Sequence, residues 1–282
     1  MGAFSADWLS LRESADTRAR AEPLARLVGD RFQDVSELRV LDLGAGTGAN
    51  VRYLAKLLPA HTQWRLVDND QALLNQAAAE IGTAGGGAVP PSIETRAVDL
   101  ARAFDSTADD IWAGRDLVTA SALLDLVSEQ WLLALARRCR DTGASVLFAL
   151  TYNGELTCSP AEPEDEMVRE LVNGHQRTNK GFGLALGPDA AESAAHAFDE
   201  LGYEVWRQES DWELGPDSAA LQAQLIEGWV EAAGIIAPED AVLLDGWKSR
   251  RLAHVADGRS RIIVGHEDLA GWLRVDQRRD RG

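Results

Sequence analysis

The sequence predicts an α/β protein built on a doubly wound, mostly parallel sheet, and two observations carry this prediction. Residues 38–54 (LRVLDLGAGTGANVRYL) show a near-continuous apolar run, which is typical of a strand covered on both faces, then a glycine cluster and a helical pattern. Strand and helix patterns then alternate as far as residue 150, with short turns between them. This order is that of a doubly wound sheet with helices on both faces.

The turn after the first strand contains Gly44, Gly46 and Gly48. Because glycine has no Cβ, these residues let the chain turn sharply and let a ligand approach the main chain. The turn also places a helix N-terminus at the carboxyl end of a strand, which is the position of a nucleotide-type site. The spacing Gly44-x-Gly46-x-x-Ala49 matches the loose dinucleotide fingerprint, so the glycines alone leave the ligand class open.

The same residues, read as Asp42-x-Gly44-x-Gly46-x-Gly48, resemble motif I of the class I S-adenosylmethionine (SAM)-dependent methyltransferases. A carboxylate at this point suits a ligand that carries an ammonium and a sulfonium better than it suits a pyrophosphate. The resemblance implies SAM as methyl donor, with contacts at Asp42, Gly44, Ala45 and Gly46. It also implies a Rossmann-like sheet of seven strands in the order 3-2-1-4-5-7-6, with the last strand antiparallel.

Residues 64–68 (WRLVD) predict a second strand, and residues 71–81 predict the helix that follows it. Asp68 ends this strand, where a carboxylate can accept hydrogen bonds from both hydroxyls of a ribose. Asp70 suits the N-cap of the helix, so we expect Asp68 and Asn69 to face the ligand. Both ligand classes use such a carboxylate, so Asp68 predicts an adenosine-type ligand without choosing between them.

Residues 82–91 predict a flexible loop, and residues 93–100 (IETRAVDL) predict a third strand. This strand ends with Val98, Asp99 and Leu100. The resemblance implies that an acidic residue here binds the adenine amino group and that its neighbours flank the ring. The alternative for Asp99 is an ordinary turn residue.

Residues 116–121 predict a fourth strand, which leads to an amphipathic helix with Ser128 as its N-cap. In the resembling family the corner between them faces the methyl donor and the acceptor. Ser121 and Ala122 are therefore predicted cofactor contacts. Asp125 is a candidate catalytic residue, and its alternatives are an acceptor-orienting group or a helix cap.

Residues 144–150 predict a fifth buried strand, and the polar segment after it is too long for a simple connection. We predict that residues 151–188 form a lid over the substrate, since loops at strand carboxyl ends line such sites. The lid is expected to begin as a polar loop, with a helix from Met167. Tyr152 is its candidate catalytic residue, and a structural or solvated role is the alternative.

The remaining segments complete the predicted organisation. Helices over residues 5–33 are expected to cover the cofactor site or to pack at the sheet edge. A helix over 189–201, ending at Gly202, precedes strands at 203–209 and 261–266, and two helices lie between these strands. The predicted divisions are a helical cover (1–36), the SAM-binding core (37–150), the lid (151–188), the second half of the sheet (189–270) with inserted helices (216–256), and a polar tail (271–282).

Composition restricts the class of protein further. The 282 residues are 45% hydrophobic and 26% charged, and the formal net charge of −17 makes a nucleic-acid substrate a poor expectation. We expect no membrane span, signal peptide or metal site. Cys139 and Cys158 show no metal-ligand spacing, and we expect no disulfide framework, which favours a reducing compartment and hence the cytoplasm. A monomer and a homodimer both remain open.

The sequence therefore predicts a methyltransferase that transfers the methyl group of SAM to an unidentified small-molecule acceptor by in-line displacement. One alternative is an NAD(P)-dependent oxidoreductase, which Asp42 before the glycines and the lack of an evident Tyr-x-x-x-Lys pair disfavour. Others are a SAM-binding regulatory or scaffold subunit and a SAM-using enzyme that does not transfer methyl.

Overall fold

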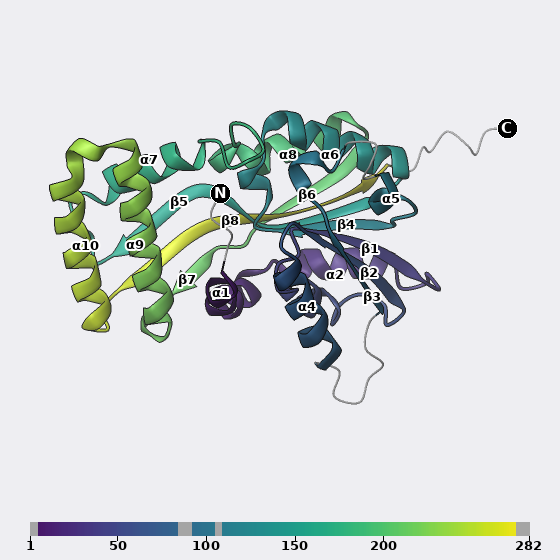
Figure 1. The fold of residues 1–282 in the computed structure, drawn as a ribbon, viewed down its shortest axis with the longest axis horizontal. Coiled ribbons are helices and arrows are strands. Elements are labelled where there is room, and N and C mark those ends of the chain that lie inside the picture. Colours follow the sequence, from purple (N-terminus) through teal and green to yellow (C-terminus); the bar gives the residue numbers. More distant parts are fainter. Residues whose placement is uncertain (1–4, 84–91, 105–108, 275–282) are drawn as a thin grey trace.

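The computed structural model describes residues 5–83, 92–104 and 109–274, and the strands of these residues form one sheet (Figure 1). Its order is β3-β2-β1-β4-β5-β8-β6, and β7 pairs with β8 beside this path. The strands are β1 (Leu38–Leu43), β2 (Thr62–Asp68), β3 (Ser92–Ala97), β4 (Leu117–Ser121), β5 (Ser145–Ser159), β6 (Tyr203–Glu209), β7 (Trp212–Leu214) and β8 (Arg261–Leu273).

The pairing of the strands confirms the predicted doubly wound sheet and its order. Strands β1 to β5 pair in parallel, whereas β8 is antiparallel to both β5 and β6. The predicted number of strands was one too low in the described part of the chain, because the three-residue β7 adds an eighth. Three residues are too few to show a periodic pattern in the sequence.

Apart from the four-residue α5, which was not predicted, the helices occupy the segments expected of them, with small shifts at their ends. They are α1 (Ala6–Ala19), α2 (Glu22–Arg31), α3 (Ala49–Leu54), α4 (Gln71–Thr83), α5 (Asp109–Trp112), α6 (Glu129–Thr142), α7 (Asp165–Gln176), α8 (Ala190–Glu200), α9 (Ala219–Ile236) and α10 (Ala241–Ala256). The Ser128 side chain caps α6 as predicted, and Gly202 follows α8 with a φ of +87°. The predicted flexible loop (82–91) and tail (271–282) lie largely outside the described residues.

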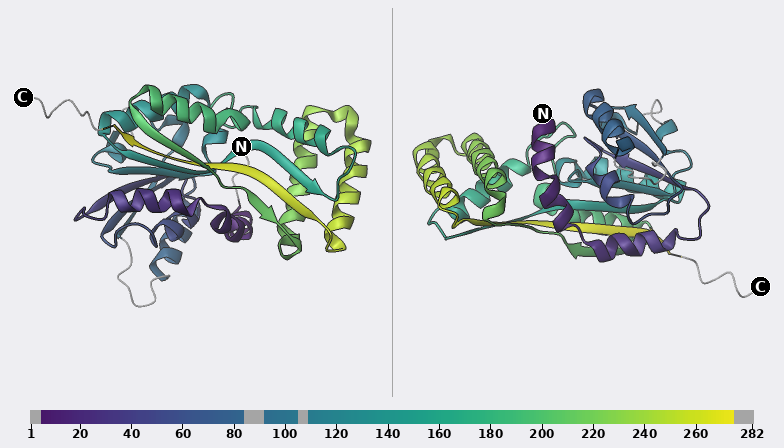
Figure 2. Two further views of the ribbon diagram at one scale, coloured as in Figure 1. Left: turned by 180° about the vertical axis from the view of Figure 1, so that it is seen from behind. Right: turned by 90° about the horizontal axis from the view of Figure 1, so that it is seen from below.

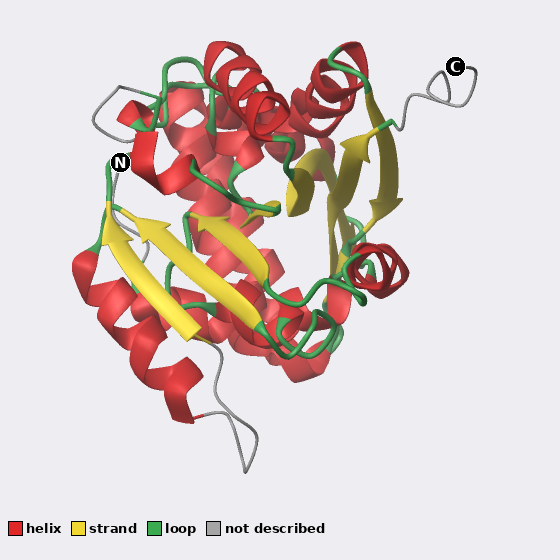
Figure 3. Ribbon diagram, turned by 90° about the vertical axis from the view of Figure 1, so that its right-hand side faces the viewer, coloured by secondary structure: helices red, strands yellow, loops and turns green. Residues whose placement is uncertain are grey.

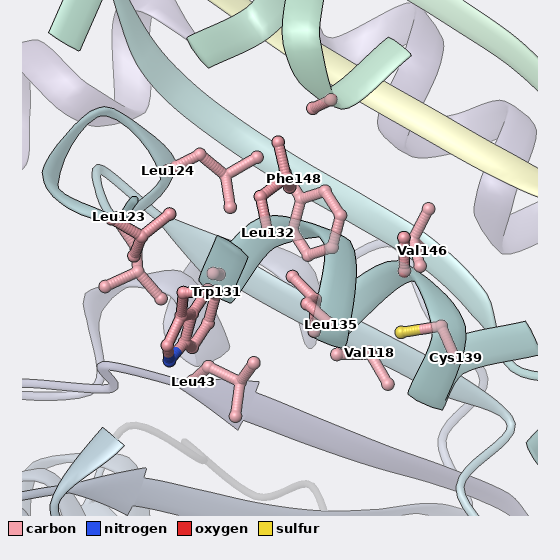
Figure 4. Close-up of a cluster of buried hydrophobic side chains, with 14 of the residues drawn as sticks. Leu43, Val118, Leu123, Leu124, Trp131, Leu132, Leu135, Cys139, Val146 and Phe148 are labelled. Carbon is pink, nitrogen blue, oxygen red and sulfur yellow. The ribbon is translucent and has the colours of Figure 1, made fainter. Parts of the chain in front are cut away.

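Helices cover both faces of the sheet, as the predicted class requires (Figure 3). On one face α5, α6 and α8 pack against β1, β4 and β5. Leu132, Leu135 and Cys139 of α6 lie toward Val146 and Phe148 of β5, whereas Trp131 lies near Leu43 of β1 (Figure 4). On the other face α2, α3 and α4 pack against β1 and β2. These two cores fix the carboxyl ends of β1, β2 and β4, which is where the predicted site lies.

A third hydrophobic core lies beyond the carboxyl end of β4, where the sheet continues as the long strands β5 and β8. It joins these strands and β7 to α1, α7, α9 and α10. Helix α1 lies between the pair α9/α10 and the strands β1 to β3 (Figures 1 and 2). The inserted helices and the predicted lid therefore belong to one packed lobe beside the first half of the sheet.

Two strands run well past their predicted ends, whereas β3 stops at Ala97, three residues before the predicted Leu100. Residues 151–159 continue β5 instead of forming a polar loop, and β8 runs seven residues past His266. In the first case buried and less buried residues alternate through Tyr152, Leu156 and Cys158, which is the period of a half-buried strand. In the second case, the charged residue Asp268 interrupts the apolar pattern of the sequence, so the strand was predicted to end too early. Its buried carboxylate accepts hydrogen bonds from the backbone N–H groups of Leu150 (2.8 Å) and Ala21 (3.0 Å).

Candidate functional site

The carboxyl ends of β1, β2, β3 and β4 surround a cavity of about 400 Å³, which we call the cofactor cavity. Nine of the eleven predicted cofactor contacts line it: Gly44, Ala45, Gly46, Asp68, Asn69, Asp99, Leu100, Ser121 and Ala122. The other two do not. Val98 packs against the hydrophobic core, and Asp42 lies beneath the cavity with its side chain buried.

The glycine turn is fastened to the end of β2 through Asp68. The Asp68 carboxylate accepts a hydrogen bond from the backbone N–H of Gly46 (2.9 Å) and another from that of Asp70 (3.0 Å). Gly46 has a φ of +52°, which favours glycine, and a Cβ there would lie 3.1 Å from Leu9 of α1. Asp70 caps α4 as predicted, accepting from the N–H of Ala72 (2.8 Å).

Asp42 contacts the cavity only through Asn50, in the first turn of α3. The Asn50 amide donates to Asp42 (2.7 Å) and to Thr119 (3.1 Å), and its oxygen accepts from Arg20 (2.8 Å). The second carboxylate oxygen of Asp42 is buried, and no described residue bonds to it. Burial raises the pKa of Asp42 from its ordinary value of 3.8 to about 7, against the opposing effects of Asn50 and Arg20.

This raised pKa predicts that replacing Asp42 by asparagine stabilises the ligand-free protein at neutral and higher pH. Between pH 3.8 and about 7 the folded carboxyl holds a proton that the unfolded one has lost. Stability therefore falls by about 1.4 kcal/mol per pH unit as the pH rises through this window, and the loss persists above it. The asparagine side chain cannot ionise, so the stability of the Asp42→Asn variant does not fall in this way as the pH rises.

Urea denaturation of both proteins at half-unit steps from pH 5 to 8 measures the difference. We expect the advantage of Asp42→Asn to grow toward pH 7 and then to level off. A difference that does not change with pH would contradict this account of Asp42.

Residues after β3 form the far wall of the cofactor cavity. The Asp99 side chain is exposed and accepts a hydrogen bond from the backbone N–H of Ala101 (3.0 Å), which lies in the short 3-10 helix η1 (Leu100–Arg102). The Leu100 carbonyl accepts from the indole N–H of Trp131 (2.7 Å). Asp99 is thus both a turn cap, as the alternative predicted, and a residue of the cavity wall.

A second cavity of about 650 Å³, which we call the acceptor cavity, adjoins the first. Both cavities are lined by Arg12, Ala122 and Leu126, so they share a wall. The acceptor cavity extends from the β4 corner into the third core, between β5, β8, α7 and α9. Its wall contains both predicted catalytic residues, Asp125 and Tyr152, and the aromatic rings of Trp8, Trp212, Trp229 and His266.

Asp125 lies in the short 3-10 helix η3 (Leu124–Leu126) at this corner and is only 7% exposed. One of its carboxylate oxygens is buried with no hydrogen-bond partner in the described residues. Burial raises its pKa to about 6. Ala122 and Leu150, which line the same cavity, are the described non-glycine residues with positive φ (52° and 53°). Such strained backbone gathers at functional sites.

The Tyr152 hydroxyl is already engaged, since it donates a hydrogen bond to Asn173 of α7 (2.7 Å). Burial raises the pKa of this hydroxyl. The Tyr152 ring lies near that of His266, which also packs against Trp212. Burial lowers the pKa of His266 to about 3, so its imidazole is neutral at physiological pH.

The resemblance implied that the N-terminal helices cover the cofactor and help to form the substrate pocket, and helix α1 does line both cavities, although Arg12 was not among the predicted site residues. Arg12 of α1 forms an ion pair with Asp16 (2.9 Å) and lies over the ring of Trp212 (5.0 Å to the centroid). Asp16 also accepts from the Trp212 indole N–H (3.0 Å). The loop after α7 crosses the shared wall as well, with Lys180 at the acceptor cavity and Phe182 at the cofactor cavity.

Residues 5–83, 92–104 and 109–274 contain no group of three or more His, Cys, Asp or Glu side chains placed to hold a metal ion. Within these same ranges none of the helices combines the length and the apolar content that crossing a bilayer requires.

Comparison with known proteins bears on the fold. No protein-family model and no curated protein sequence matches the chain. A cyclopropane-fatty-acyl-phospholipid synthase-like protein from Lactobacillus casei is 13% identical, with 96% of this chain and 94% of that chain covered and a TM-score of 0.55. A SAM-dependent methyltransferase from Thiobacillus denitrificans, in complex with S-adenosylhomocysteine, is 16% identical (96% and 99% covered, TM-score 0.48).

A third solved structure is that of phosphoethanolamine N-methyltransferase 2 from Haemonchus contortus. It is 16% identical, with 89% of this chain covered and a TM-score of 0.41. The chain spans about half of that protein, since 52% of its length is covered. Together with the strand order, the likeness to the Lactobacillus casei structure shows that this chain has the fold of the class I SAM-dependent methyltransferases.

Proposed function

We propose that the protein is a SAM-dependent methyltransferase that acts on a small-molecule acceptor. The observation that carries this proposal is the pair of adjoining cavities, one lined by the predicted cofactor contacts and the other by Asp125 and Tyr152. A methyl group held at their shared wall would face an acceptor in the second cavity. Volumes of about 400 and 650 Å³ are ordinary for small-molecule sites.

The residues of the cofactor cavity suit SAM. Asp68 offers a carboxylate to the ribose hydroxyls, and Asp99 offers one at the wall assigned to adenine. Asn50 presents a polar side chain that hydrogen-bonds to Asp42, and a ligand that carries two positive groups would favour the ionised form of the Asp42 carboxyl. When bound, SAM supplies an activated methyl group.

Positioning is the main contribution that we assign to the chain's own residues. Walls that hold two reactants in line and near contact can lower a barrier by about 7–11 kcal/mol without a covalent intermediate. Arg12, Ala122 and Leu126 form the boundary at which such alignment is set. Asp125 is our candidate base at this boundary. We assign Tyr152 to the wall of the acceptor cavity, because its hydroxyl already donates a hydrogen bond to Asn173.

Isothermal titration of the protein with SAM and with NAD tests this proposal. We expect SAM and S-adenosylhomocysteine to bind with micromolar or tighter affinity and NAD to bind at least about 100-fold more weakly, because Asp68 and Asp99 line the cavity with carboxylates that a pyrophosphate would approach. Tight binding of NAD without binding of SAM would overturn the proposal and restore the oxidoreductase alternative.

A cytoplasmic location is a second part of the proposal. It is supported by two cysteines, Cys139 and Cys158, which are buried as free thiols. Burial raises the pKa of both, so they are poor nucleophiles and suit a reducing compartment.

A further inference from the structure

The acceptor cavity contains a carboxylate that the fold leaves without a counter-ion in contact. Asp125 is 7% exposed, and one of its oxygens has no hydrogen-bond partner among the described residues. A buried polar group of this kind costs free energy unless a ligand satisfies it. The ligand must therefore bring a hydrogen-bond donor, a positive charge or both to this point of the cavity.

The two basic side chains that face Asp125 are engaged elsewhere. Arg12 lies in its ion pair with Asp16 and over the Trp212 ring. The Lys180 ammonium lies against the imidazole of His175 (3.2 Å), and its partial burial lowers its pKa. Both exert only longer-range electrostatic effects on Asp125, and neither makes an ion pair with it. The position opposite the free oxygen is thus left to the acceptor.

The remaining wall favours a cation with an apolar body over a neutral alcohol. The rings of Trp8, Tyr152 and Trp229 line the cavity, beside that of Trp212, over which Arg12 already lies. The faces of aromatic rings attract cations, and the attraction is strongest where water is excluded. His266, also in this wall, is neutral and adds no repulsion. A carboxylate among aromatic rings is the combination that binds an organic ammonium ion.

We infer that the acceptor is an organic amine, which binds as its ammonium ion with Asp125 as counter-ion and proton acceptor. This inference rests on the proposed methyltransferase function. The ammonium nitrogen gives one proton to the Asp125 carboxylate, which becomes a neutral carboxyl. The nitrogen lone pair so freed forms the new N–C bond with the methyl group of SAM, while the C–S bond breaks and its electron pair stays on sulfur. The product is the N-methylated ammonium ion.

Fluorescence titration tests this, because three of the lining residues are tryptophans. The probes are phenyltrimethylammonium, its uncharged isostere tert-butylbenzene, and benzoate, each added to the protein saturated with S-adenosylhomocysteine. We expect the cation to bind about tenfold or more tightly than the isostere, and benzoate to bind more weakly than both. Asp125→Asn should remove most of the advantage of the cation.

Lys180→Met provides a control of opposite sign. The positive charge of Lys180 repels a bound cation, so its removal should leave the affinity for the cation unchanged or raise it. An anionic acceptor would instead lose affinity in Lys180→Met and gain it in Asp125→Asn. The affinity of the wild type for the cation should also fall as the pH drops below about 6, where Asp125 takes up a proton, and Asp125→Asn should lose this dependence. Arg12, Lys180 and Tyr152 interact electrostatically with Asp125, and the other ionisable residues that line the cavity are His175, Glu231 and His266.

Equal binding of the cation by the wild type and Asp125→Asn, or preference for benzoate, would overturn the inference. SAM titration of the same two proteins separates this failure from that of the proposed function. Asp125 does not line the cofactor cavity, so SAM should bind both proteins equally. If SAM binds neither protein, the methyltransferase proposal fails, and the cation titration, repeated without S-adenosylhomocysteine, still shows whether Asp125 binds an ammonium ion.

Discussion

Replacing Asp68 by alanine is expected to weaken SAM binding by at least about 100-fold. A hydrogen bond to a charged group contributes about 1.5–3 kcal/mol, and two ribose hydroxyls would lose their acceptor. The variant also frees the backbone N–H groups of Gly46 and Asp70, which the carboxylate holds at 2.9 and 3.0 Å. The glycine turn then loses its attachment to β2, so both the contact and its preorganisation are lost. Isothermal titration measures the change.

Two further variants make this result specific. Asp68→Asn keeps one acceptor oxygen without the charge, and its affinity for SAM should lie between those of the wild type and Asp68→Ala. Asp116→Ala removes a carboxylate that accepts from a backbone N–H at the opposite end of the sheet, that of Arg39 (2.8 Å), and SAM should bind to it normally. If Asp68→Ala remains folded and its affinity for SAM is within threefold of the wild-type value, Asp68 does not belong to the cofactor site.

The first half of the fold could be predicted because its signals are local. The strand, the three glycines and the helix at residues 38–54 lie within one stretch, and Asp68 ends the next strand. The same local pattern could not show that Asn50 would lie between Asp42 and the cavity. That depends on how the first turn of α3 folds back over β1, which only the packed structure fixes.

The acceptor cavity was largely hidden from the sequence, because its walls come from distant segments. The bond from Trp212 to Asp16 joins residues 196 positions apart, and no periodic pattern connects them. Residues 151–159 carried an alternation that could have revealed the long β5. The polar residues at the less buried positions of this segment led to the prediction of a loop. Asp125 and Tyr152 were found only because they follow strands whose carboxyl ends could be predicted.

The lobe that encloses the acceptor cavity is expected to depend on Asp165, at the start of α7. Its carboxylate forms an ion pair with Arg251 of α10, which is fully buried, and accepts from the indole N–H of Trp247 (2.7 Å). Arg251 also donates to the Pro160 carbonyl (2.6 Å) just after β5. Asp165 therefore joins three of the elements that hold the cavity wall in place.

Replacing Asp165 by alanine should lower the free energy of unfolding by about 3–5 kcal/mol, because it leaves the Arg251 guanidinium buried without its counter-ion. Guanidinium-chloride denaturation measures the loss. The double variant Asp165→Leu/Arg251→Met removes both charges and should lose less than the single one, since apolar side chains can replace a buried ion pair at little cost. Arg259→Ala, which breaks an exposed pair with Asp257, should cost less than about 1 kcal/mol. If the single variant were as stable as the Arg259 control, Asp165 would not be what joins α7 to α10, and the enclosure of the acceptor cavity would have to rest on the apolar contacts of the third core.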